Sequence, residues 1–129
     1  MINKKAKGTK AERDLLHKFW KEGWACLRSA GSGSMRYPGP DLVVGNKIRR
    51  LAIECKTCRE ITKYLSKEDI AQLNDFSKIF GAESWFAIKF DKLEWFFITP
   101  EDLIKTEKGF KVDMKLLKDK GLLFEELLK

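Results

Sequence analysis

The sequence has no long apolar run, few cysteines and a single histidine, and each of these shortages argues against a class of protein. Its uninterrupted apolar stretches are short, such as Trp95 to Ile98, whereas a membrane-spanning helix needs about 20 apolar residues. The first residues, Met-Ile-Asn-Lys-Lys, lack the apolar stretch of a secretory signal. We therefore expect no membrane partner and a cytoplasmic location.

The cysteine and histidine content argues against disulfides and zinc. Cys26, Cys55 and Cys58 are an odd number of thiols for a disulfide framework, and a reducing compartment does not favour one. Cys55 and Cys58 form a C-x-x-C pair, but a zinc site needs two further ligands, and only Cys26 and His17 remain. Cys55 also falls within a predicted strand, not at the strand-to-helix turn of redox motifs. We expect buried or half-buried thiols that serve packing.

The positive charge is concentrated in one half of the chain. The net charge is +7; residues 1–63 contain 15 Lys and Arg against 6 Asp and Glu, and residues 64–129 contain 11 against 13. A basic half suits a surface that meets phosphates. Basic charge that serves solubility alone would give the same count, so the asymmetry leaves nucleic-acid binding as one of two interpretations.

The length of 129 residues fits one domain with a hydrophobic core, and neither a repeat nor a linker divides it. Periodicity and turn residues predict helices over 9–21 and 67–80, strands over 24–28, 41–44, 49–56, 85–90, 94–99 and 109–112, and short helices from Pro100 and over 122–128. Ser66 and Asp69 have the spacing of a capping box. This order predicts a single α/β domain, residues 1–129, with a central mixed β-sheet flanked by helices.

The most informative pattern joins Asp41 to Glu54-Cys55-Lys56. On a strand, Glu54 and Lys56 project from one face, while Cys55 points into the core. Asp41 lies opposite Glu54 if the turn between the two strands is centred between residues 47 and 48. A turn centred on residues 45 and 46 would instead pair Asp41 with Arg50, and the sequence leaves both registers open.

Two facing carboxylates need a positive charge between them, and Mg²⁺, with Mn²⁺ as a substitute, is the natural occupant. Phosphodiester hydrolysis uses such a cation to stabilise the transition-state charge and to activate water. Asp41 and Glu54 would hold the metal, the Cys55 carbonyl would add a ligand, and Lys56 would position the water or neutralise the developing charge. The plainer alternative is a surface Asp beside a Glu–Lys ion pair.

These residues resemble a known family. Asp41 with Glu54-Cys55-Lys56 is similar to the PD-(D/E)xK nuclease motif, and the longer pattern resembles the archaeal Holliday junction resolvases. The matching segments are residues 8–15, 28–32, 40–43, 53–56 and 76–81, within a resemblance that spans roughly residues 7 to 98. The resemblance implies a restriction-endonuclease-like nuclease fold and a homodimer that binds four-way junction DNA and nicks two strands symmetrically with Mg²⁺.

The resemblance also assigns roles to single residues. It implies metal-site and catalytic roles for Glu12, Asp41, Glu54 and Lys56, an active-site hydroxyl for Ser32, phosphate contacts for Arg13 and Arg28, and a dimer interface at Phe76 and Phe80. Each has a plainer alternative. Glu12 has the spacing of a capping-box partner of Thr9. Ser32 could be an ordinary loop serine, Arg13 and Arg28 could be solvated surface charges, and Phe76 and Phe80 could be core residues.

Further DNA contacts are expected from the basic N-terminus and from the loop. Lys4, Lys5, Lys7 and Lys10 would meet the phosphate backbone, with residues 1–7 as a mobile arm, although a frayed basic terminus looks the same. Ser32 and Arg36 are the DNA-binding candidates in the loop. The segment between Ser32 and Asp41 departs from the family pattern because it is longer and richer in Gly and Pro.

Three other functions compete with a junction-resolving endonuclease. A related nuclease that cuts duplex or damaged DNA would have the same acidic cluster, so only substrate preference separates the two. A noncatalytic module that binds structured DNA gains nothing from carboxylates that face phosphates. An interaction protein without a nucleic-acid role is disfavoured by the charge asymmetry, and a steep salt dependence of DNA affinity would exclude it.

Overall fold

The central element is a mixed sheet of five strands. The computed structural model describes the backbone of residues 4–29, 37 and 39–129, and the side chains from residue 8 onward within these ranges. The strand order is β1-β2-β3-β5-β6, formed by β1 (Ala25–Arg28), β2 (Leu42–Gly45), β3 (Arg50–Cys58), β5 (Glu83–Phe90) and β6 (Phe96–Ile98). β3 and β5 are parallel and the other pairs antiparallel. The predicted mixed sheet is confirmed.

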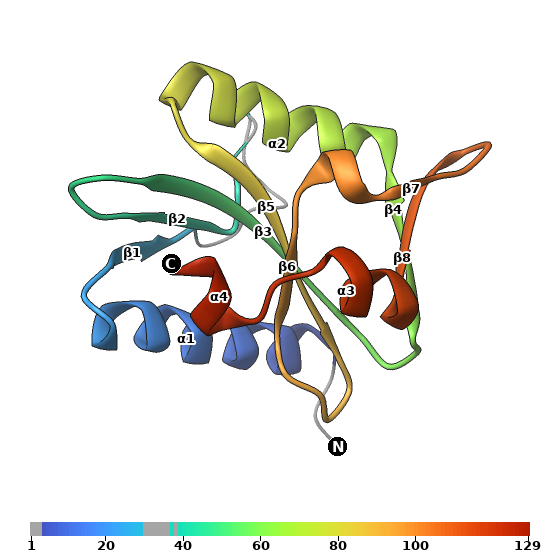
Figure 1. Cartoon of the computed structure of the whole chain (residues 1–129), viewed down its shortest axis with the longest axis horizontal. Coiled ribbons are helices and arrows are strands. Elements are labelled where there is room, and N and C mark those ends of the chain that lie inside the picture. The colour runs from blue at the N-terminus through green and yellow to red at the C-terminus, as the bar shows by residue number, and fades with distance from the viewer. Residues whose placement is uncertain (1–3, 30–36, 38) are drawn as a thin grey trace.

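Helices cover both faces of this sheet (Figure 1). α1 (Lys4–Lys21) lies on one face, where its Leu15 and Phe19 share a core with Phe124 and Leu127 of the C-terminal helix α4 (Phe124–Leu127). α2 (Lys67–Phe80) lies on the other face, where Leu73 shares a second core with α3 (Met114–Lys120). Because both faces are covered, the middle strands are apolar on both sides and a polar side chain on them is an exception.

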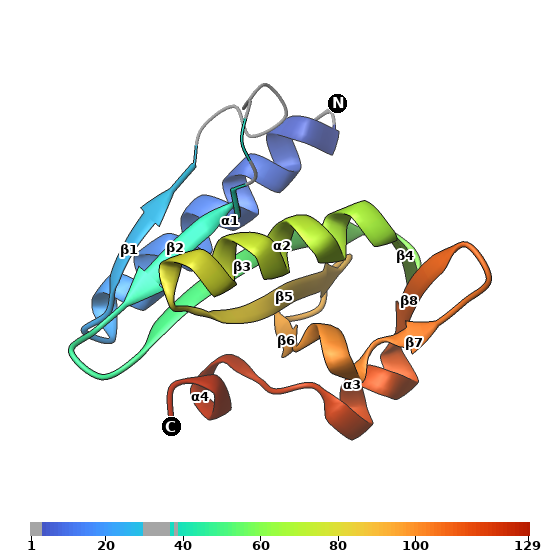
Figure 2. The ribbon, with the colours of Figure 1, turned by 90° about the horizontal axis from the view of Figure 1, so that it is seen from above.

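A small second sheet extends the domain beyond the predicted elements. Its order is β4-β8-β7, from β4 (Thr62–Ser66), β8 (Gly109–Asp113) and β7 (Ile104–Lys105), and the 3₁₀ helix η2 (Pro100–Asp102) leads into it. The strand predicted over 109–112 is confirmed, and the short helix predicted from Pro100 is the 3₁₀ helix η2. β4, β7 and α3 were not predicted. Figure 2 shows this sheet at one end of α2, where β4 leads directly into the helix.

α1 begins earlier than predicted. The helix starts at Lys4, not at residue 9, and runs through Gly8 and Thr9. Thr9 is therefore inside the helix and does not cap it, which removes the capping-box alternative for Glu12. Residues 4–7 belong to the first turn of α1 and residues 1–3 lie outside the described residues, so the mobility of the basic arm stays a prediction.

The ends of α2 follow the predicted signals. The Ser66 side chain accepts a hydrogen bond from the backbone N–H of Asp69, and the Asp69 side chain accepts one from that of Ser66. Gly81 ends the helix with a φ of 82°, a conformation that favours glycine. The capping box fixes the direction in which α2 leaves β4, and with it the place of Asp69.

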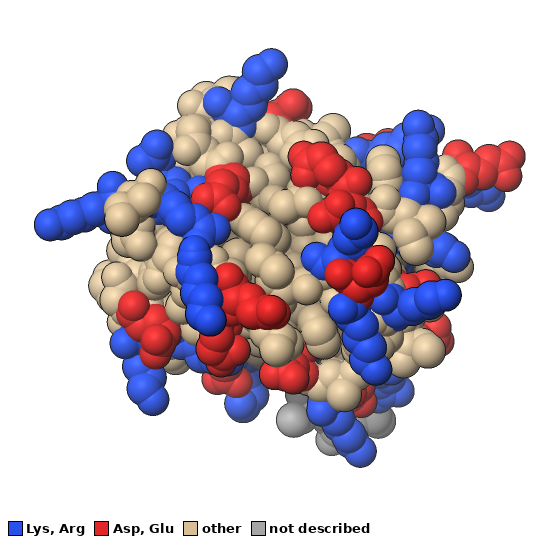
Figure 3. Space-filling view, viewed as in Figure 1, with Lys and Arg blue, Asp and Glu red and all other residues tan. Residues whose placement is uncertain are grey.

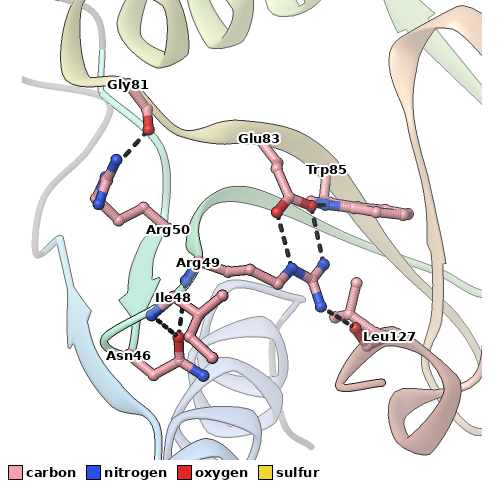
Figure 4. A network of polar contacts seen from close by, with 8 residues as sticks. All are labelled: Asn46, Ile48, Arg49, Arg50, Gly81, Glu83, Trp85 and Leu127. Atoms are coloured by element: carbon pink, nitrogen blue, oxygen red, sulfur yellow. Dashed lines mark hydrogen bonds and ion pairs between the residues drawn. The ribbon is translucent and has the colours of Figure 1, made fainter.

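A polar network ties the start of β3 to β5 and α4 (Figure 4). The Arg49 guanidinium donates to both Glu83 carboxylate oxygens, at 2.8 and 2.9 Å, and to the Leu127 carbonyl at 2.7 Å. Asn46 closes the β2–β3 turn, because its side-chain oxygen accepts from the backbone N–H groups of Ile48 and Arg49. These contacts hold the C-terminus against the sheet and fix where β3 begins.

The three cysteines are free thiols. Cys26 and Cys55 are buried and Cys58 is half-buried, with Cys55 inside β3 as predicted. The expected packing role fits this placement. Within the described part of the chain, no helix has the length and apolar character required to cross a membrane.

Candidate active site

The register of β2 and β3 brings Asp41 and Glu54 face to face. Leu42 pairs with Ile53, and one step further along the same antiparallel register Asp41 comes level with Glu54. The turn is thus centred between residues 47 and 48, and the alternative pairing of Asp41 with Arg50 is excluded, because Arg50 pairs with Gly45. Two like charges directly opposite each other are normally unfavourable in a sheet, which indicates a functional reason for the pair.

Asp41 is a buried carboxylate held by the backbone of β3. Its side chain is 7% exposed. Its Oδ2 accepts a hydrogen bond from the backbone N–H of Cys55 at 2.8 Å. This bond offsets part of the free-energy cost of burying the Asp41 charge. It also holds Asp41 against Cys55, the residue between Glu54 and Lys56 on β3.

Glu54 and Lys56 project together from β3 as predicted. Burial, the Asp41 charge and a hydrogen bond between the two carboxyl groups raise the pKa of Glu54 to about 8, although the Lys56 charge lowers it. The Lys56 ammonium lies 3.6 Å from Glu54 Oε2. At neutral pH the Glu54 carboxyl is therefore largely protonated beside Asp41.

Glu12 reaches the same region from α1. Its carboxylate accepts a hydrogen bond from Arg28 Nε at 3.0 Å, and both side chains are largely buried. Burial and the Asp41 charge raise the pKa of Glu12, while the Arg28 hydrogen bond and charge lower it. Glu12 is thus close enough to Asp41 to be affected by its charge, and Arg28, a predicted phosphate contact, is engaged with Glu12.

The donor set fits a hard divalent cation that keeps water and phosphate ligands. In the described part of the chain no three Asp, Glu, His or Cys side chains meet as a ready-made metal-binding group. Asp41 and Glu54 form a pair of oxygen donors with excess negative charge, and Mg²⁺ is commonly bound by one or two carboxylates together with waters and substrate phosphates. The carbonyl of Cys55 is a further oxygen on the same strand.

The DNA-binding candidates on α1 are accessible where their side chains are described. Lys10 and Arg13 are exposed. Lys10 pairs with Asp14 at 3.0 Å on an open surface, where an ion pair contributes little and leaves the lysine available to a phosphate. Lys4, Lys5 and Lys7 lie in the first turn of α1. Ser32 and Arg36 lie outside the described residues.

The face covered by α3 and α4 carries charges of both signs. Figure 3 shows Lys and Arg side chains interspersed with Asp and Glu over this face, without a continuous basic area. This agrees with the near balance of charge in residues 64–129, which contain 11 basic and 13 acidic residues.

The aromatic side chains divide between core and surface. Phe86 and Phe97 are fully buried, so these parts of β5 and β6 belong to the core. Phe76 and Phe80 on α2 stack with ring centroids 5.3 Å apart, and Phe80 remains 48% exposed. Together with Ile79, which is 90% exposed, they form an apolar patch at the C-terminal end of α2.

One residue of the site was not identified from the sequence as part of it. Asp69 Oδ2 lies 3.4 Å from the Lys56 ammonium. The sequence shows Asp69 only as a capping-box partner of Ser66, and its contact with Lys56 depends on how α2 packs against β3. The capping box predicts where Asp69 lies on the helix, but it does not predict the contact with Lys56.

A mixed sheet flanked by helices, with an Asp at the start of one strand and Glu-x-Lys on the next, defines the class of PD-(D/E)xK nucleases. A solved structure supports this: the Archaeoglobus fulgidus Hjc, described as a Holliday junction resolvase, matches with a TM-score of 0.88 and 42% identity over 95% of this chain and 100% of that one. The fold is thus restriction-endonuclease-like.

The sequence comparisons define the family. Residues 3–129 match the family described as archaeal Holliday junction resolvase (Hjc). The crossover junction endodeoxyribonuclease Hjc of Archaeoglobus fulgidus is 47% identical over 84% of this chain and 80% of that protein. The protein of the same name from Methanocaldococcus jannaschii is 41% identical over 90% of this chain and 83% of that protein. The chain belongs to the archaeal Holliday junction resolvase family.

Proposed function

We propose that this protein resolves four-way DNA junctions by paired, Mg²⁺-dependent nicking near the branch point, acting in the cytoplasm as a homodimer. Membership of a family of crossover junction endodeoxyribonucleases makes it a DNA-cutting enzyme. The observation that carries the assignment of the site is the register of β2 and β3, which sets the buried Asp41 opposite Glu54 with Lys56 alongside.

In the proposed site, Asp41 and Glu54 would hold Mg²⁺ together with the Cys55 carbonyl. The cation, when bound, stabilises the charge that develops on the phosphate and favours ionisation of the attacking water. Lys56 holds that water or the phosphate oxygens next to the carboxylates. Glu12 completes the metal site from α1, and the hydrogen bond from Cys55 N–H keeps Asp41 from turning away.

Binding of DNA is proposed to use the basic end of α1. Lys4, Lys5, Lys7, Lys10 and Arg13 belong to the same helix as Glu12, and Glu12 is close enough to Asp41 to be affected by its charge. Arg28 would add a contact when it leaves Glu12, and Ser32 and Arg36 would add contacts from the loop. Such contacts position the junction without reading its sequence.

A homodimer is proposed through the apolar patch of Phe76, Ile79 and Phe80. Exposed apolar patches of this kind mark interaction surfaces. A two-fold axis places the same patch on both subunits, so Phe76 and Phe80 of one chain would meet their counterparts. It would also deliver two equivalent active sites to two equivalent strands of a four-way junction, which explains paired nicking.

The decisive experiment compares cleavage of a labelled four-way junction with that of a matched linear duplex, with Mg²⁺, with Mn²⁺ and with chelator. Paired nicks near the branch point that need the metal and disappear in Glu54→Ala, while junction binding survives, are expected. Equal cutting of the duplex would make the protein a general nuclease. Tight junction binding without cutting under either metal would leave a binding module.

A further inference from the structure

Lys56 lies between two carboxylates that come from different elements. Its ammonium is 3.6 Å from Glu54 Oε2 on its own strand and 3.4 Å from Asp69 Oδ2 on α2. The side chains of Lys56 and Asp69 are 21% and 32% exposed, so the contact is partly shielded from water. A shielded contact of this kind is screened less by salt than a surface pair.

Asp69 makes two hydrogen bonds to Ser66 at the start of α2. Its backbone N–H donates to Ser66 Oγ at 3.0 Å, and its Oδ2 accepts from the Ser66 backbone N–H at 3.4 Å. The same oxygen thus faces both the N-cap of α2 and the Lys56 ammonium. The bond to Ser66 is long for an N–H···O bond, so capping alone does not account for the orientation of this carboxylate.

The two carboxylates differ in what happens to them during the reaction. Glu54 is a proposed metal ligand, and a carboxylate that binds a cation attracts a neighbouring ammonium less. Asp69 comes from another element, α2, and is not a proposed metal ligand. Its attraction for Lys56 is therefore not shared with a cation when Glu54 is engaged.

We propose that Asp69 is a positioning residue that holds the Lys56 ammonium toward the scissile phosphate. The lysine side chain is long and flexible, and a fixed carboxylate restricts it to the orientation that the reaction uses. Asp69 itself touches neither substrate nor metal in this arrangement. The inference rests on the proposed role of Lys56.

The test is Asp69→Asn, which removes the charge and keeps an oxygen that can accept from the Ser66 N–H. Cleavage of a four-way junction is measured in a single turnover with Mg²⁺ and saturating enzyme, and the junction Kd is measured separately with chelator. The cleavage rate is expected to fall about ten- to a hundredfold, as for other small misplacements of a catalytic group. The Kd is expected to change less than about twofold, because phosphate affinity comes from the basic surface.

Two matched controls separate positioning from helix stability. Glu68→Gln removes one negative charge from an exposed position in the same helical turn, and Ser66→Ala removes the cap acceptor without touching Lys56. Glu68→Gln is expected to cut at nearly the wild-type rate. Ser66→Ala is expected to lose clearly less rate than Asp69→Asn, because the Asp69 carboxylate keeps its contacts with the Ser66 N–H and with Lys56. Asp69→Glu is expected to recover part of the rate lost in Asp69→Asn. Equal rate losses in Asp69→Asn and Ser66→Ala would show that Asp69 acts only through the cap.

Lys56→Ala distinguishes a failure of this inference from a failure of the proposed site. If Lys56→Ala loses cleavage while Asp69→Asn cuts like wild type, Lys56 is catalytic and Asp69 does not position it. If Lys56→Ala cuts like wild type, the proposed role of Lys56 is wrong and the inference falls with it. In the double variant, Asp69→Asn is expected to lower the rate no further than Lys56→Ala alone.

Discussion

The buried Asp41 carboxylate accepts a hydrogen bond from the backbone N–H of Cys55, with 2.8 Å between the two atoms. This contact joins the start of β2 to the middle of β3 at the point where Glu54 and Lys56 project. Asp41 therefore has two separate effects, one on the backbone of β3 through Oδ2 and one on Glu54 through its charge. Substitutions can separate these effects because an amide keeps the acceptor and loses the charge.

Asp41→Asn and Asp41→Ala are both expected to lower junction cleavage by about a hundredfold or more, since each removes a charged metal ligand. Their stabilities should differ. Alanine leaves the buried Cys55 N–H without its acceptor, at a cost of about 1–3 kcal/mol relative to asparagine. Single-turnover cleavage and urea unfolding check the two effects, and equal stability of the two variants would contradict the structural role.

Stability is expected to fall with rising pH because of Glu54. Its pKa is about 8 in the folded protein, against an ordinary value of 4.5. Between these values the folded chain binds more protons than the unfolded chain, so the free energy of unfolding decreases as the pH rises. Glu54→Gln stays neutral, and at about pH 8 it should be more stable than wild type by on the order of 4 kcal/mol. Urea unfolding at about pH 5 and about pH 8 with chelator measures the free energy of unfolding of both proteins. The same decrease between the two pH values in Glu54→Gln as in wild type would refute the prediction.

Mg²⁺ is expected to stabilise the folded protein at about pH 8 in the absence of DNA. The cation would replace the proton on Glu54, and a ligand that binds only the folded state raises the Tm with its concentration. Thermal unfolding is followed while Mg²⁺ is added and then removed with chelator. Glu54→Gln serves as the control that should not respond, and an equal response in both proteins would place the bound cation elsewhere.

The sequence predicted the part of the fold that depends on local signals. The alternation in β3, the Ser66 and Asp69 capping box and the glycine at the end of α2 act within a few residues, and the structure confirms each of them. The register of Asp41 and Glu54 stayed open between two pairings. It depends on the Asn46 side chain, which accepts from Ile48 and Arg49 and centres the turn between residues 47 and 48.

What the sequence did not reveal depends on contacts between distant segments. Residues 62–66 form a strand, β4, because they pair with β8, about 45 residues further along the chain. Gly8 and Thr9 are typical of residues at the start of a helix, yet α1 begins at Lys4 and continues through both. The contact between Asp69 and Lys56 likewise joins a helix to a strand and leaves no pattern in the sequence.

The ion pair of Arg49 and Glu83 is expected to stabilise the folded protein above about pH 4. The Arg49 hydrogen bonds lower the pKa of Glu83 below its ordinary value of 4.5. A lowered folded pKa means that the stabilisation is complete above the ordinary value and is lost as the pH falls through the lowered one. Because Glu83 is 41% exposed, Glu83→Gln should cost less than about 1 kcal/mol at neutral pH, and nothing at low pH.

Arg49→Ala should cost more than Glu83→Gln at neutral pH. It also removes the bond to the Leu127 carbonyl and the contact of the guanidinium with the Trp24 ring, 5.6 Å from its centroid. We expect a loss of about 1–3 kcal/mol. Arg50→Ala is the control, because Arg50 is exposed and donates to the Gly81 carbonyl on the surface. Equal losses for the two arginines in urea unfolding would mean that α4 does not depend on Arg49.

Phe80→Glu is expected to give a folded monomer. Phe80 is 48% exposed in the single chain, so a charge there should change the stability of that chain little while it disrupts an apolar contact between two copies. Leu93→Glu is a matched control, since Leu93 is an apolar residue of similar exposure, 43%, on the turn between β5 and β6.

Sedimentation measures the oligomeric state, and a supercoiled plasmid with an extruded four-way junction reports whether the two nicks are paired. Phe80→Glu should sediment as a monomer and release singly nicked circles, whereas Leu93→Glu should stay dimeric and give linear product. A Phe80→Glu protein that stays dimeric with paired nicks would place the interface elsewhere on the chain.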